Sequence, residues 1–183
     1  MTLRHIEDRD WPTIVDLEAS AYADCGLSEG RDALQSRAFP ATSFVLDAGG
    51  AVAGYLLALP YPRFRYPDLA RPEADRFDTS NLHLHDLVIA KRYRGLGLAR
   101  RLLARLTATA RDSGYGRISL VAVAGTAGFW SAQGYRGHPR VPVPAGYGPD
   151  AAYMSRTLVT RPHHPREKAR QWPAIAISSA GPS

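Results

Sequence analysis

Two short stretches of the sequence hold residue types suited to chemistry. The first is residues 92–97, RYRGLG, in which two glycines follow two arginines just before an amphipathic segment. Glycine lets a backbone approach a ligand closely, helix N-termini attract anions, and arginine pairs with phosphate oxygens. We therefore predict a phosphate-binding turn at residues 92–97.

The spacing excludes two other phosphate-binding turns. A P-loop requires Lys and then Ser or Thr after its glycines, whereas Gly97 is followed by Leu98 and Ala99. A dinucleotide fingerprint needs a third small residue where this chain has Arg100. The turn fits neither of these classes.

The second stretch is residues 82–89, LHLHDLVI, directly before that turn. It contains His83, His85 and Asp86. A histidine titrates near neutral pH, which suits proton transfer, and Asp86 can orient a histidine, act through water or bind a cation. We predict these three residues as the catalytic acid–base candidates, without choosing among them. A His-x-His pair with no third ligand nearby is weak evidence for a metal, and we predict none.

The elements around these stretches follow from apolar periodicity. Leu82 and Leu84 are at even positions and Leu87 and Ile89 are at odd positions, so the apolar side chains would change face along a regular strand. This change predicts a bulge near His85. A helical face of leucines predicts an amphipathic helix from residue 98 to about residue 114. The other predicted helices are Trp11 to Tyr22, Arg31 to Phe39 and Ala127 to Gln133, and the other predicted strands are Thr2 to Ile6, Thr42 to Asp47, Ala51 to Ala58, Ile118 to Ala124 and Ala151 to Leu158. These predict an α/β domain with local antiparallel pairing.

The segment from Leu59 to Ser80 has four prolines and no usable periodicity. It predicts a long ordered loop, either a lid or binding wall or a variable surface insertion. Its Arg63 and Arg65 have three candidate partners: a substrate carboxylate, the adenosine 3′-phosphate of a cofactor, or water.

Two motifs give the chain a resemblance to the GNAT acetyltransferase superfamily over most of residues 2–159. Arg92, Gly95 and Gly97 match the signature Gln/Arg-x-x-Gly-x-Gly/Ala, and residues 129–135, FWSAQGY, resemble the second motif of that family. The resemblance implies an α/β (α+β) fold with a mixed central sheet of about six to seven strands, a splayed and bulged fourth strand, and about four flanking helices.

The resemblance also implies acetyl-CoA as co-substrate and direct attack of an amine on its thioester. The pantetheine arm would pair with the strand near Leu87, and the N–H groups from Arg94 to Ala99 would hold the pyrophosphate. An N–H of the bulged strand would stabilise the oxyanion. The implied cofactor-binding residues are Leu87, Val88, Ile89, Arg92, Arg94, Gly95, Leu96, Gly97, Leu98, Ala99 and Trp130.

Trp130 departs from the family pattern, because many members have a tyrosine there that protonates the leaving thiolate. An indole N–H is far too weak an acid for that role. Tyr135 or Tyr147 could replace it, or the thiolate could leave unassisted, since an ordinary thiol has a pKa of about 8.5.

Composition limits the class of protein. The 183 residues carry a net charge of +6, and Cys25 is the only cysteine, which excludes an internal disulfide. Beyond Thr160, four basic residues stand against Glu167, so half of the excess charge lies in the tail. We predict one domain over residues 1–159 and a disordered, basic, Pro- and Ser-rich tail over residues 160–183. Nucleic-acid binding is therefore not the leading interpretation.

The longest apolar stretch is too short to span a membrane, and we expect a soluble, cytoplasmic monomer or homodimer. The leading functional hypothesis is acetylation of a primary amine on a small molecule. The alternatives are acetylation of a protein lysine or N-terminus, and a non-catalytic module that binds acetyl-CoA as a sensor.

Overall fold

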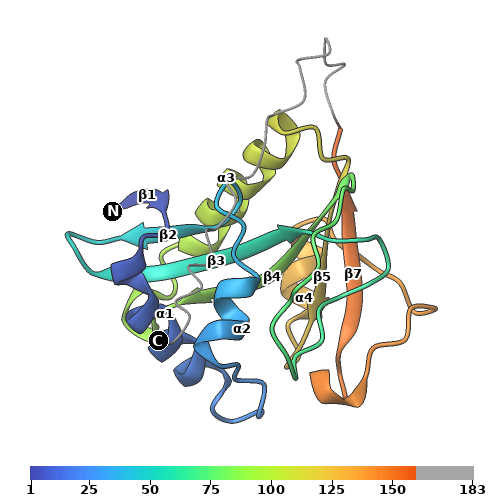
Figure 1. The fold of residues 1–183 in the computed structure, drawn as a ribbon, viewed down its shortest axis with the longest axis horizontal. Helices are drawn as coiled ribbons and strands as arrows, with labels where there is room; N and C mark the ends of the chain where they lie inside the picture. The colour runs from blue at the N-terminus through green and yellow to red at the C-terminus, as the bar shows by residue number, and fades with distance from the viewer. Residues whose placement is uncertain (160–183) are drawn as a thin grey trace, which may run out of the picture.

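A computed structural model describes residues 1–159, in which seven strands form one mixed sheet of order β1-β2-β3-β4-β5-β7-β6 (Figure 1). The strands are β1 (Thr2–His5), β2 (Phe44–Asp47), β3 (Val52–Pro60), β4 (Asn81–Ile89), β5 (Arg117–Ala122), β6 (Arg136–Gly137) and β7 (Ala152–Thr157). The helices are α1 (Trp11–Tyr22), α2 (Arg31–Ser36), α3 (Leu98–Asp112) and α4 (Ala127–Ala132), with 3-10 turns η1 (Asp8–Asp10), η2 (Lys91–Tyr93) and η3 (Ala145–Tyr147). The predicted α/β fold with a mixed sheet is confirmed.

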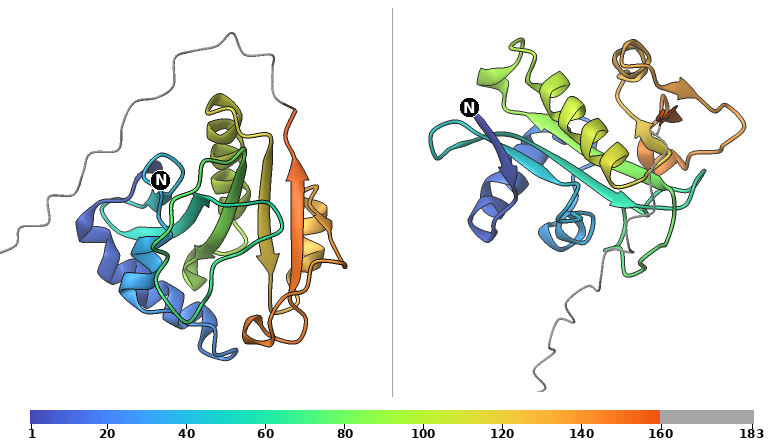
Figure 2. Two further views of the ribbon diagram at one scale, coloured as in Figure 1. Left: turned by 45° about the vertical axis from the view of Figure 1, so that its right-hand side comes forward. Right: turned by 90° about the horizontal axis from the view of Figure 1, so that it is seen from above.

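The helices cover both faces of the sheet. Viewed from above, α1 and α2 lie on one face and α3 on the other (Figure 2). Leu102 and Leu106 of α3 are fully buried in one core cluster, whereas Trp11 and Ile14 of α1 join a second cluster against Tyr55 of β3. Burial of these side chains is the main force that holds each helix on the sheet.

The sheet opens beside β4. This strand pairs with β3 along its length, but it pairs in parallel with β5 only over Asn81, Leu82 and His83. From Leu84 onward no residue of β4 has a partner on β5. The backbone groups of β4 that point toward β5 are therefore available beyond that point, as a splayed strand requires.

The predicted bulge lies at His85. Leu57 of β3 is opposite Asp86 and Ala58 is opposite Leu84, so His85 is an extra residue with no partner. An extra residue reverses the alternation of side chains along a strand. His85 and Asp86 are therefore neighbours in sequence and yet both contact groups on the α1 and α2 side.

The loop between β3 and β4, residues 61–80, is an ordered wall on the α1 and α2 side of the sheet (Figure 2). The guanidinium of Arg37, just after α2, donates from Nη2 to the carbonyls of Asp68 (2.8 Å) and Arg71 (3.1 Å). From the other side, the Tyr147 hydroxyl donates to the Pro67 carbonyl. The loop is therefore held against the rest of the domain from two sides.

The elements differ from the predicted ones at several ends; for example, β2 begins at Phe44 and not at Thr42, and β5 ends at Ala122 and not at Ala124. Helix α2 ends at Ser36 and not at Phe39, because the chain turns so that the N–H of Phe39 donates to the Ala58 carbonyl. Strand β3 extends to Pro60. The two-residue strand β6 was not predicted, because so short a strand has no periodicity.

The predicted tail, residues 160–183, lies outside the described residues. Within residues 1–159, no helix has both the length and the apolar composition needed to cross a bilayer.

Candidate active site

Asp86 is a buried acid of the site. It is 4% exposed and accepts hydrogen bonds from the hydroxyls of Tyr22 (2.7 Å) and Tyr55. Burial raises its pKa to about 6, although both hydroxyl bonds oppose that shift because they favour the carboxylate. Asp86 is thus a fixed carboxylate held between α1 and β3.

His85 and Glu29 form a close pair. Glu29 lies in the loop between α1 and α2, and its Oε2 is 2.6 Å from His85 Nε2, while Arg37 Nε donates to the same nitrogen from 3.1 Å. Burial lowers the pKa of His85 well below its usual value and raises the pKa of Glu29 to about 7, an effect that the charge of Arg37 only partly offsets.

These contacts locate one shared proton. Arginine always donates, so Nε2 of a neutral His85 has its lone pair facing Arg37 and Glu29. Two bare acceptors would repel each other at 2.6 Å, so this geometry is that of the pair with a hydrogen between Nε2 and the Glu29 oxygen. Because burial raises the pKa of Glu29 to about 7, the pair holds this hydrogen below that pH and loses it above that pH, where it can accept a proton.

His83 is buried where the strands separate. Its Nδ1 is 3.2 Å from Ser119 Oγ on β5, and Asn81 Nδ2 donates to the same oxygen from 2.8 Å. The Ser119 hydroxyl is thus free to donate to Nδ1, which leaves the hydrogen of His83 on Nε2. Burial, with smaller contributions from His85 and Arg37, lowers the pKa of His83 well below its usual value, so this ring is neutral.

The three sequence-predicted acid–base candidates line one cavity of about 50 Å³. Glu18, Glu29 and Tyr22 line it from the α1 side, and Val121 and Val123 line it from β5 and the residues after it. The cavity lies between β4 and β5 beyond their last paired residues, at the opening of the sheet. The bulge therefore gathers the predicted catalytic residues at the splay.

The Gly-rich turn follows β4 as predicted. Gly95 and Gly97 have φ of 80° and 72°, a left-handed conformation that favours glycine, and Gly97 is the N-cap of α3. A Cβ built on either glycine would have no heavy atom within 4 Å, so the turn is open on that side. Arg94 folds back and donates from Nε to the Ile89 carbonyl (3.1 Å), and the Arg92 guanidinium stacks over Tyr93. The turn has the conformation and the charge of a phosphate site.

The aromatic residues considered for the leaving-group role are all buried. Trp130 is 8% exposed and stacks edge-on against Tyr135, with ring centroids 5.5 Å apart. Burial raises the pKa of both Tyr135 and Tyr147, so each is a weaker acid than an ordinary tyrosine. The hydroxyl hydrogen of Tyr147 is already given to the Pro67 carbonyl.

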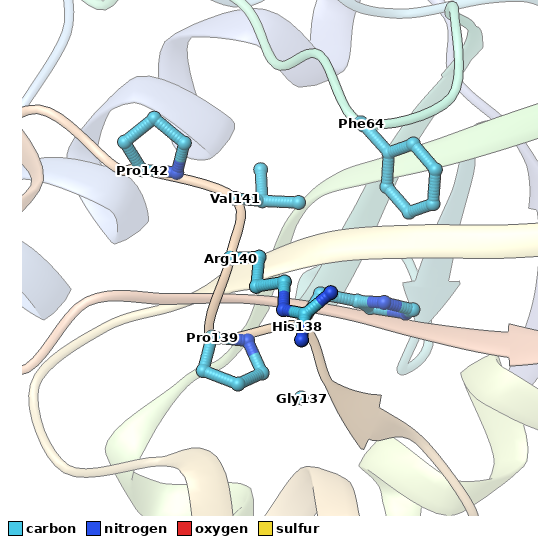
Figure 3. Close-up of a pocket in the computed structure, with 7 residues that line it drawn as sticks. All are labelled: Phe64, Gly137, His138, Pro139, Arg140, Val141 and Pro142. Atoms are coloured by element: carbon cyan, nitrogen blue, oxygen red, sulfur yellow. The ribbon is translucent and has the colours of Figure 1, made fainter.

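A larger hollow of about 580 Å³ lies between Phe64 and the segment after β6 (Figure 3). Figure 3 shows Phe64 on one side and Val141 and Pro142 on the other. Its lining includes Arg140 and His138 but no carboxylate, and none of the polar residues of β4. Size alone therefore does not identify the site. Arg63 and Arg65 stack over Phe64 and Phe77 and line neither this hollow nor the cavity at the splay.

Sequence reasoning missed several residues of the site: Glu18, Tyr22, Glu29, Arg37 and Tyr55. Only Glu18 left a signal, because it falls four residues after Ile14 on the buried face of α1, where a carboxylate needs a buried partner. Glu29 and Arg37 come from segments without periodicity. Within residues 1–159, no group of three or more His, Cys, Asp or Glu side chains is arranged to hold a metal ion.

Comparison with known proteins identifies the family of this chain and shows structures of similar fold. The model of the acetyltransferase (GNAT) family matches residues 2–135, and the chain belongs to that family. By sequence, the chain matches none of the curated proteins.

Three solved structures illustrate the likeness of fold. Ard1 from Thermoplasma volcanium is 14% identical with a TM-score of 0.67, and the match covers 86% of this chain and 97% of that one. The ribosomal-protein-S18-alanine N-acetyltransferase from Escherichia coli is 18% identical with a TM-score of 0.65, covering 87% and 95%. N-acetylglutamate synthase from Neisseria gonorrhoeae, complexed with coenzyme A and N-acetyl-glutamate, is 16% identical with a TM-score of 0.67, covering 86% of this chain and 35% of that one.

Replacing Arg37 with methionine is expected to destabilise the domain by about 3 kcal/mol, because Glu29 and two loop carbonyls then lose a buried partner. This corresponds to a fall in Tm of about 6 to 12 °C. Arg71→Met is the matched control, since the Arg71 side chain is 78% exposed in its ion pair with Asp68 and is expected to contribute under about 0.5 kcal/mol. Thermal unfolding followed by circular dichroism measures both, and equal Tm values would contradict the role given to Arg37.

Proposed function

We propose that this protein is an N-acetyltransferase that uses acetyl-CoA to acetylate the primary amine of a small molecule by direct attack. One observation carries the proposal: the cavity that holds His83, His85 and Asp86 lies at the opening between β4 and β5, directly before the Gly-rich turn. A thioester held along β4 and an amine in the cavity would then meet at the bulge. Membership of the acetyltransferase family supports acetyl-CoA as the co-substrate.

The cofactor is proposed to lie along β4 and the N-terminus of α3. The unpaired edge of β4 supports backbone pairing with the pantetheine arm, and the open turn with its left-handed glycines supports binding of the pyrophosphate. The residues given these roles are Leu87, Val88, Ile89, Arg92, Arg94, Gly95, Leu96, Gly97, Leu98 and Ala99. Trp130, which occupies the position of the usual tyrosine of the family, is also proposed to contact the cofactor.

The Glu29–His85 pair is proposed as the base and Asp86 as the anchor of the ammonium group. An amine must lose a proton before it attacks, and an acceptor with a pKa near 7 takes that proton at the pH of the cell. Asp86 already accepts two hydroxyl hydrogen bonds, which fix its position and favour its charged form. His83, a neutral ring that presents Nε2–H, would donate to a polar atom of the acceptor.

The chemistry balances without a side-chain acid. The amine nitrogen bonds to the carbonyl carbon of the acetyl group, the carbon–sulfur bond breaks, and the electron pair leaves with sulfur. One amine proton goes to the Glu29–His85 pair, and the second is released to the thiolate or to water. A thiol with a pKa of about 8.5 yields a stable enough thiolate for this departure. The raised pKa of Tyr135 and Tyr147 supports this unassisted form.

A small acceptor is favoured over a protein because the loop of residues 61–80 covers the acceptor side. Leu69 from this loop lines the cavity, and the Arg37 and Tyr147 bonds hold the loop in place. A protein substrate needs an open groove beside the reacting atoms.

The test is a free-thiol release assay with acetyl-CoA against primary amines, amino acids and short peptides, run beside calorimetric titration of coenzyme A. Release that depends on a small amine supports the proposal. Release only with peptides would favour a protein acetyltransferase. Tight coenzyme A binding with no release from any acceptor would favour the sensor.

A further inference from the structure

We infer that the acceptor is a primary amine on an apolar chain with no carboxylate beside the amino group. This inference rests on the proposed function, and it names the class of amine. Such an amine differs in charge from an amino acid, so the distinction depends on the charges around the cavity and on the shape of its entrance.

The cavity has an excess of buried acid. Glu18, Glu29 and Asp86 line it, and Glu18 is 1% exposed. Glu18 accepts hydrogen bonds from the Ser28 hydroxyl (2.7 Å) and the Glu29 N–H (2.6 Å), neither of which carries a charge. Burial raises the pKa of all three carboxyls, because each carboxylate charge is costly there without a counter-ion, and a bound cation would stabilise the charged forms.

One buried acceptor atom still lacks a hydrogen bond. The Glu29 side chain is 5% exposed, and its Oε1 lies 2.6 Å from Arg37 Nη2 as an ion pair. That contact does not have the alignment of a hydrogen bond, so Oε1 has no donor within the described residues. Because buried polar atoms are almost always hydrogen-bonded, this oxygen retains the capacity to accept a hydrogen bond from a bound group. An ammonium group has three N–H donors and can supply this bond.

The described residues that line this cavity include no cation to receive a substrate carboxylate. Its lining, as described, includes no lysine or arginine. Arg37 is the nearest buried cation, but it lies behind the lining at 0% exposure, where it bonds His85 and the carbonyls of Asp68 and Arg71. An α-carboxylate would therefore lie close to three acids without a counter-ion, which is costly.

The space outside the cavity is apolar. A hollow of about 480 Å³ shares Leu27, Leu69 and Tyr147 with the cavity, and Tyr66, packed edge-on against Tyr147, lines its outer part. The lining of this hollow also includes no lysine or arginine, and its one charged residue is Asp68. The inner cavity, at about 50 Å³, has room for roughly three to five water-sized groups. An ammonium group and its first carbons fill the cavity, and an apolar remainder fits the hollow.

The experiment compares amines with the amino acids that differ from them by one carboxylate. Phenethylamine is paired with phenylalanine, isoamylamine with leucine and tryptamine with tryptophan, each with saturating acetyl-CoA in the thiol-release assay. In the pair that fits the hollow best, kcat/KM for the amine is expected to exceed that for the amino acid by at least about 30-fold. The neutral amide of the same amino acid separates charge from size, and it is expected to recover part of the lost rate.

Glu18→Gln removes one of the three acids without changing the size of the side chain. It should lower the ratio of kcat/KM for the amine to kcat/KM for the matched amino acid. Asp16→Asn is the matched control on the exposed side of α1, and its ratio should equal that of the unchanged protein. If each amino acid is turned over as well as its matched amine, or better, the inference is overturned but the proposed function stands. Arg37 Nη1 would then be the partner of the substrate carboxylate. Coenzyme A binding with no thiol release from either member of any pair would overturn both.

Discussion

Replacing Gly97 with valine is expected to weaken coenzyme A binding by about 100-fold or more while the domain stays folded. Gly97 has a φ of 72° and begins α3, so its neighbours present the N–H groups of the first helical turn. A valine there disfavours this φ and projects a branched side chain into the open side of the turn, where the pyrophosphate is proposed to lie. Losing one or two hydrogen bonds to a charged group, each worth about 1.5 to 3 kcal/mol, corresponds to this loss of affinity.

The matched control is Gly114→Val at the other end of α3. Gly114 also has a left-handed φ, of 83°, and a Cβ there also meets no atom within 4 Å. The two variants should therefore lose similar stability, about 1 to 2 kcal/mol, while only Gly97→Val loses affinity. Isothermal titration calorimetry with coenzyme A measures the difference. Equal affinity in both variants would remove the pyrophosphate from this turn.

The Gly-rich turn and the bulge could be predicted because both depend on residues close together in the sequence. Two glycines directly before a helical leucine pattern predicted a turn at the start of a helix, and the structure has this turn at Gly95 and Gly97, before α3. The change of parity between Leu84 and Leu87 reflected an extra residue in β4, and the register with β3 puts that residue at His85. Local sequence pattern therefore predicts the part of the structure that we propose for the cofactor.

The acceptor half could not be predicted, because its residues come together only through tertiary packing. Tyr22 and Tyr55 are 33 positions apart and still bond the two oxygens of Asp86. Nothing in the sequence distinguishes Arg37 from a surface arginine. Its complete burial depends on hydrogen bonds to the carbonyls of residues 68 and 71, which are distant in sequence. No periodicity connects such segments, so the acid–base partner of His85 was found only in the structure.

Glu29→Gln is expected to lower kcat by about 100-fold or more, the usual effect of removing a positioned base. The pH profile makes the assignment specific. The base acts as a carboxylate, and burial raises its pKa to about 7, so kcat/KM of the unchanged protein should rise as pH increases through about 7. Above a pH of about 10 it should fall again, because the substrate ammonium loses its own proton. Glu29→Gln should lose the lower limb and keep the upper one.

Asp32→Asn is the control, because Asp32 is an exposed acid in the first turn of α2, three residues from Glu29. This variant should keep both limbs and the full kcat. A lower limb that remains in Glu29→Gln with a midpoint near 6 would point instead to Asp86, whose pKa is raised to about 6. Thermal unfolding of each variant checks that the loss of rate does not come from loss of the fold.

A double variant separates a shared proton from two independent contributions. If Glu29 and His85 act together on one proton, removing either group disables the pair, and removing the second adds little. The kcat of the double variant Glu29→Gln/His85→Ala should then be at most about threefold lower than that of the slower single variant. Independent residues would instead give a loss of kcat equal to the product of the two single losses. Losses of kcat that multiply would mean that each residue acts alone. The base would then be assigned from the pH profiles of the single variants, and the 2.6 Å contact between Glu29 and His85 would have only a structural role.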